Sequence, residues 1–124
     1  MQFLSDQWFD ALEDALARAG EPEGGERCAI GQLVTGAPGG DVAYTLVAGA
    51  GPAALVRDSI APAEVVLVED YETARAIASG VAPSDALAAG RVKVRGDVQA
   101  LLRAQGFLAA LVEAGAELRA RTVF

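Results

Sequence analysis

The sequence predicts a single α+β domain that occupies residues 1–124. Three observations support this fold class. The length of 124 residues suits one domain. The hydrophobic content of 52% and a mean hydropathy of +0.30 exclude a mainly disordered chain. Segments with helical spacing alternate along the chain with short segments of strand character, which predicts helices packed on a sheet.

The chain is expected to begin with an amphipathic helix over residues 5–19, with Ser5 or Asp6 as its N-cap. The apolar positions that recur at helical spacing are Leu4, Trp8, Leu12, Ala15, Leu16 and Ala19. Gly20 ends this helix, and residues 21–26 form a turn-rich linker that is too short to separate two domains.

Four short segments of strand character follow, at residues 27–35, 42–48, 53–59 and 64–69. The spacers between them are rich in glycine and proline, which is typical of turns. This spacing predicts an antiparallel meander. Because residues 65–68 are continuously apolar, the last of the four is expected as an inner strand covered on both faces.

Two helices are expected next. Asp70 is placed as the N-cap of a helix over residues 71–79. Ser84 is placed as the N-cap of a second, shorter helix, with Pro83 at its entry and Gly90 after its end.

A final strand and a final helical region complete the expected order. Residues 91–95 alternate strictly, so two valines face inward and three cations face water. Asp97 is expected to cap a helical region over residues 98–120, bent or interrupted at Gly106 and weakened at Gly115.

Composition excludes several classes of function. Ten basic and 17 acidic residues give a net charge of −7, which opposes binding to nucleic acid or to an anionic membrane surface. There is no histidine, so histidine-based catalysis and metal sites are excluded. The lone Cys28 forms neither an intrachain disulfide nor a thiolate cluster, and it is consistent with the cytoplasm. We expect no metal, no cofactor, no signal peptide and no integral membrane segment.

Two patterns could indicate chemistry. Glu69 and Asp70 form the one acidic pair that adjoins an apolar strand, but a helix cap explains Asp70, and nothing requires a carboxylate with a perturbed pKa. The glycines of Gly49–Gly51 follow an apolar strand as in a dinucleotide site, yet the residues after them leave hardly two turns for the required helix. We interpret them as a hairpin turn, and no catalytic residue is assigned.

The stretch from Asp70 to Leu102, DYETARAIASGVAPSDALAAGRVKVRGDVQALL, resembles the sterol carrier protein type-2 family of lipid-binding domains. The shared order is a strand, an acidic turn, a helix, a proline-bearing turn, a second helix, the segment GRVKVRGD and an apolar helix. The upstream layout fits the same family. This resemblance implies a five-stranded mixed or antiparallel sheet covered by helices, with an apolar tunnel for lipids between the layers.

The resulting hypothesis is non-catalytic binding and transfer of a fatty acid, a fatty acyl group or a sterol-like lipid. The ligand-binding residues proposed from the stripe of the first helix and from the resemblance are Trp8, Leu12, Leu101, Leu102, Gln105, Phe107, Leu108 and Leu111. Gln105 could orient a polar headgroup. One alternative is a closed core of the same fold that acts as a dimerisation or protein-interaction module, with a possible homodimer. A minor alternative is a nucleotide-binding enzyme that uses Gly49–Gly51.

Overall fold

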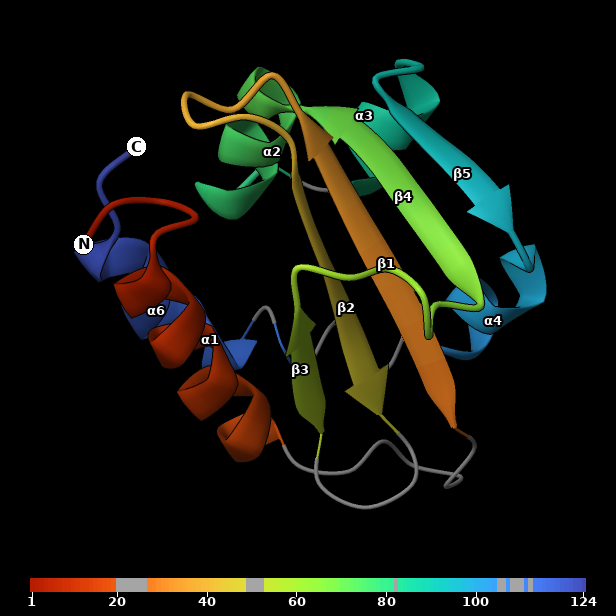
Figure 1. The fold of residues 1–124 in the computed structure, drawn as a ribbon, viewed down its shortest axis with the longest axis horizontal. Coiled ribbons are helices and arrows are strands. Elements are labelled where there is room, and N and C mark those ends of the chain that lie inside the picture. Colours follow the sequence, from red (N-terminus) through yellow and green to blue (C-terminus); the bar gives the residue numbers. More distant parts are fainter. Residues whose placement is uncertain (20–26, 49–52, 82, 105–106, 108–110, 112) are drawn as a thin grey trace.

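The structure is a computed structural model that describes residues 1–19, 27–48, 53–81, 83–104, 107, 111 and 113–124. Its elements alternate as the sequence predicts, with one helix before four strands, then two helices, a fifth strand and a helical C-terminal region (Figure 1). The α+β class is therefore confirmed. The two ends of the chain lie side by side, because Gln2 and Val123 form a parallel β-bridge.

The sheet is mixed, with the strand order β3-β2-β1-β4-β5. The strands are β1 (Cys28–Thr35), β2 (Val42–Ala48), β3 (Ala54–Arg57), β4 (Val65–Asp70) and β5 (Val92–Gly96). The first three form the predicted antiparallel meander. The fourth is an inner strand as predicted, but it does not continue the meander. It pairs with β1 in parallel, and β5 then pairs with it antiparallel.

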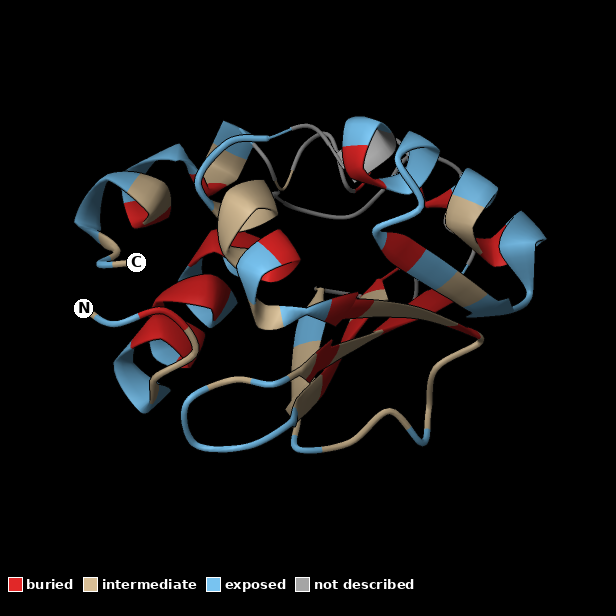
Figure 2. Ribbon diagram, turned by 90° about the horizontal axis from the view of Figure 1, so that it is seen from above, coloured by how far each residue is buried: buried red, intermediate tan, exposed pale blue. Residues whose placement is uncertain are grey.

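The physical reason for this difference is the crossover of residues 58–64. Parallel neighbours need a connection that crosses the sheet, and here an irregular segment runs over the face opposite the helices (Figures 1 and 2). Its Ile60 and Ala63 lie against Gly31 of β1, where an added Cβ would be 2.9 Å from the Cβ of Ala63. The hydroxyl of Thr45 donates a hydrogen bond of 2.7 Å to the carbonyl of Ser59 and so ties the crossover to β2.

The described helices lie together on the other face of the sheet or beside it (Figure 2). They are α1 (Asp6–Ala19), α2 (Tyr71–Ala78), α3 (Pro83–Ala88), α4 (Val98–Arg103) and α6 (Ala116–Arg121). The helix starts follow the predicted capping chemistry in three cases. Ser5 Oγ accepts from the Trp8 amide, Asp70 from the Thr73 amide and Asp97 from the Gln99 amide.

One prediction about a helix start is wrong. Helix α3 begins at Pro83, so Ser84 is its second residue and not its cap; proline is well suited to the first helical position, because its missing N–H has no partner there anyway. The helical region predicted over 98–120 is divided, with α4 ending at Arg103, and the weak point predicted at Gly115 is confirmed, because this residue immediately precedes α6. The bend expected at Gly106 lies outside the described residues.

One hydrophobic core fills the layer between the helices and the sheet. Its largest fully buried side chains include Leu16 of α1, Ile30 of β1, Val65 of β4 and Phe107. An aromatic cluster closes the layer near the chain ends, where Trp8 packs edge-on against Phe3, with ring centroids 5.0 Å apart. The core thus joins both ends of the chain to the sheet.

Candidate functional site

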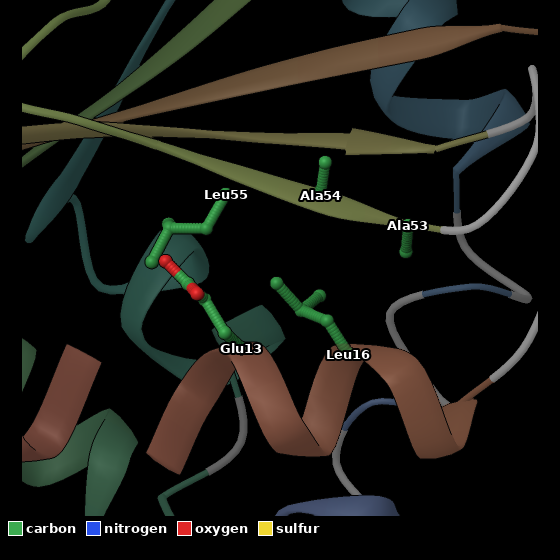
Figure 3. A pocket seen from close by; sticks show the side chains of 5 residues that line it. All are labelled: Glu13, Leu16, Ala53, Ala54 and Leu55. Carbon is green, nitrogen blue, oxygen red and sulfur yellow. The ribbon is translucent and has the colours of Figure 1, made fainter. Parts of the chain in front are cut away.

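A hollow of about 280 Å³ lies between α1 and the edge strand β3 (Figure 3). It is lined by Glu13, Leu16, Ala53, Ala54 and Leu55. Leu16 is completely buried, so the floor of the hollow is the hydrophobic core itself. The hollow therefore borders the layer between helix and sheet.

Arg57 holds β3 against α1 beside this hollow. Its guanidinium lies 2.6 Å from a carboxylate oxygen of Asp10 and 3.0 Å from one of Glu13. It also lies over the ring of Phe9, 5.6 Å from the ring centroid. The hydrogen bond to Asp10, followed by the one to Glu13, raises the pKa of Arg57. These contacts are exposed, so the ion pairs of Arg57 with Asp10 and Glu13 add little stability, and breaking them costs little free energy.

The predicted ligand-binding residues of the first helix are buried. Trp8 and Leu12 are 6% and 7% exposed. The ring of Trp8 also packs against Phe9 and Tyr44. The prediction that Trp8 belongs to the buried stripe is confirmed. Whether these side chains contact a ligand stays a prediction.

The predicted residues of the C-terminal region fall into three groups. Phe107 is buried in the core, and Leu101 and Leu111 are half-buried against it. Leu102 is 51% exposed on α4, so in this structure it faces outward and not into the layer. Gln105 and Leu108 lie outside the described residues.

Glu69 is a buried acid whose burial the sequence pattern did not predict. Glu69 is only 8% exposed. Its burial, and next the charge of Asp70, raise the pKa of Glu69 to about 7. Nothing in the sequence required a carboxylate with a perturbed pKa, whereas the burial of Glu69 in the structure does. The sequence feature that could have indicated this burial is the position of Glu69 at the end of a continuously apolar strand, immediately before the capping Asp70.

The glycines that resemble a dinucleotide site lead into a strand. Residues 49–52 lie outside the described part of the chain, but β3 follows them and pairs antiparallel with β2. A pyrophosphate site of this kind needs a helix N-terminus at that point. No finding supports the nucleotide-binding alternative.

The described residues contain no group of three or more metal-ligating side chains placed to hold a metal ion. In the same part of the chain, no helix combines the length and the apolar content needed to cross a bilayer. Burial raises the pKa of the Cys28 thiol, which disfavours its reactive thiolate. The cytoplasmic location and the homodimer stay predictions.

The structure is similar to solved structures of sterol carrier proteins. A conserved protein from Thermus thermophilus, described as possibly a sterol carrier protein, is 23% identical, with a TM-score of 0.69 over 95% of this chain and 90% of that one. A sterol carrier protein 2 is 20% identical, with a TM-score of 0.69 over 94% and 98%. A palmitated sterol carrier protein 2 like 2 from Aedes aegypti is 17% identical, with a TM-score of 0.62 over 86% and 95%.

These similarities establish the fold. No family model matches the sequence, and no curated protein matches it. The chain has the fold of sterol carrier protein 2, a five-stranded mixed sheet with helices, as the resemblance implied.

Proposed function

We propose that this chain binds and carries a hydrophobic ligand, a lipid with a long apolar chain or a sterol-like body, between its helices and its sheet. The observation that carries the proposal is the fold, which extends over nearly the whole chain in the comparison with sterol carrier protein 2. One structure of this fold is a palmitated protein. Carriage requires no covalent step, so we assign no catalytic residue and no cofactor.

The driving force is removal of apolar surface from water. Each buried methylene contributes about 0.8 kcal/mol, so twelve of them contribute roughly 10 kcal/mol before the cost of immobilising the ligand. The layer between the helices and the sheet supplies such an environment, because a cluster of buried apolar side chains lies there. The net charge of −7 plays no part in this attraction.

We place the entrance at the hollow between α1 and β3. Leu16 at its floor belongs to the core. Strand β3 has four residues and lies at the edge of the sheet, so it can separate from α1 without breaking a central ladder. The exposed ion pairs of Arg57 with Asp10 and Glu13 are the polar contacts that such an opening must break.

Two measurements test binding. Native mass spectrometry of the freshly purified protein, before and after organic extraction, is expected to show a hydrophobic ligand that co-purifies. The extracted protein is then titrated with a pyrene-labelled alkane, which has no polar end, and is expected to take it up. A clean mass together with no uptake of the alkane would refute the proposal.

A matched pair of variants tests the entrance. Ala53, just before β3, points towards α1 (Figure 3), whereas Ala61 is exposed in the crossover on the opposite face of the sheet and does not line the hollow. Ala53→Trp should fill the hollow and reduce alkane uptake several-fold, while Ala61→Trp should leave uptake unchanged. Thermal unfolding of both variants checks that they fold. Equal uptake by the two variants would exclude an entrance at this hollow.

A further inference from the structure

The direction of the Glu69 side chain follows from the register of the sheet. Gly31 pairs with Val66, and an added Cβ at Gly31 would contact the side chains of both Val66 and Ala63. Val66 therefore lies on the face that the crossover covers. Because side chains alternate along a strand, Leu67 and Glu69 point to the opposite, helix-covered face. Leu67 packs against the core there, and Glu69 is more than nine-tenths buried.

Glu69 lacks a polar partner inside this layer. Among the described residues, its carboxylate takes part in no hydrogen bond or ion pair, and the bond that Thr35 donates goes to its backbone carbonyl. The carboxylate oxygens keep a small contact with solvent, since they are not among the fully enclosed side-chain atoms that lack a partner. An acid buried to this extent without a protein partner destabilises a fold. The polar end of a ligand can supply the hydrogen bond that the described residues do not.

Two further polar groups face the same layer. Tyr44 lies on the helix-covered face of β2 and packs against Trp8, and its hydroxyl makes no hydrogen bond with a described residue. Tyr44 is in register with Gln32, and Gln32 is in register with Leu67, two residues before Glu69 on β4, so the phenol and the acid lie on the same face of the sheet. Burial, and next the charge of Glu69, raise the pKa of Tyr44. On α2, the helix after β4, Thr73 is 1% exposed; its hydroxyl lies beside the carboxylate of Asp70 but makes no well-formed hydrogen bond with a described residue.

We propose that Glu69 and Tyr44 form the polar end of the ligand site and that they select a lipid ending in a hydroxyl group over one ending in a carboxylate. The inference rests on the proposed function and specifies its ligand. A hydroxyl can donate to the acid and accept from the phenol at the same time. A carboxylate would meet the like charge of Glu69 in a layer where charge is weakly screened.

The separation of this polar end from the entrance fits a long chain. Leu55 at the hollow lies in register with Leu46, Ile30 and Val65 on successive strands. Glu69 is four residues further along β4. Three strand spacings across and four residues along correspond to roughly 20 Å. This distance is close to the length of an extended long-chain alcohol, which would place its methyl end near the hollow.

Competition between two ligands of equal chain length tests the inference. Extracted protein loaded with the pyrene-labelled alkane is titrated at pH 8 with hexadecanol or with hexadecanoate, below the concentrations at which either aggregates. Wild-type protein is expected to bind the alcohol roughly tenfold or more tightly than the acid, because like charges in a partly buried site repel by this order. Glu69→Gln should reduce that difference to roughly threefold or less.

A control separates this role from a general change of charge. Glu72→Gln makes the same substitution at an exposed position of α2 and should retain the wild-type preference. Wild-type binding of hexadecanoate as tightly as hexadecanol, or an unchanged preference in a folded Glu69→Gln protein, would overturn the inference while leaving lipid carriage intact. If Glu69→Gln does not fold, the wild-type preference alone decides. If the pyrene-labelled alkane does not bind at all, the proposed function itself fails.

Discussion

The buried acid predicts that the protein becomes less stable as the pH rises from 5 to 8. The pKa of Glu69 is about 7 in the folded protein, against 4.5 for a free glutamate side chain. The folded state therefore holds a proton that the unfolded chain has already lost, and the free energy of unfolding must fall with increasing pH in this interval. The shifted pKa of Glu69 lowers the free energy of unfolding by about 3 kcal/mol in total, and about 2–3 kcal/mol of this decrease occurs between pH 5 and pH 8.

Few other groups complicate the pH dependence of stability between pH 5 and pH 8. The chain has no histidine. The amide of Thr73 lowers the pKa of Asp70, so the stability that Asp70 contributes is lost only in acid, as the pH falls through its depressed value. The raised pKa values of Cys28 and Tyr44 act above pH 8, where the unfolded forms of these groups ionise first.

Urea unfolding at several pH values measures the effect. Trp8 is the only tryptophan, it is buried, and its fluorescence reports the transition. Glu69→Gln should remove most of the pH dependence and should be more stable than the wild type at pH 8. The exposed Glu72→Gln should follow the wild-type curve. Wild-type stability that is constant or rises between pH 5 and pH 8 would show that Glu69 is not held protonated by burial.

Other substitutions test the fold. Trp8→Ala should cost about 3–5 kcal/mol, and wild-type emission should be blue-shifted, because the indole lies in the core; emission like that of free tryptophan would contradict this. Gly96→Ala should destabilise strongly, since the new Cβ would lie 2.6 Å from the carbonyl oxygen of Glu64 at a φ of +96°. Gly39→Ala, which meets nothing within 4 Å, is its control in thermal melts. Asp70→Ala should cost about 0.5–2 kcal/mol through the lost cap of α2, measured by urea unfolding, and no loss would exclude the cap.

Local features of the fold could be read from the sequence because local chemistry determines them. A side chain that accepts a bond from an amide two or three residues later specifies a helix start, and Ser5, Asp70 and Asp97 all act in this way. Strict alternation placed Val92 and Val94 inward, and both lie against the core or within it. The resemblance carried by GRVKVRGD then indicated the sterol carrier protein 2 fold.

The partner of β4 was not predictable, because it depends on a distant contact. The crossover needs a residue without a side chain beneath Ala63, and Gly31 meets this requirement more than thirty positions earlier. The same contact decides which face of β4 each residue occupies. Only the tertiary structure therefore shows that Glu69 points into the helix-covered layer and Val66 does not.

The candidate site shows the same division. Helical spacing identified Trp8 and Leu12 as buried, because one face of a single helix is enough to indicate it. The same spacing could not show that Leu102 is exposed, since that depends on where α4 lies over the sheet. The hollow beside Ala53 is still less accessible to sequence reasoning, because it exists only where α1 meets the edge of β3. Local patterns determined the elements and their buried faces, whereas contacts between residues far apart in the chain decided the strand order, the hollow and the buried acid.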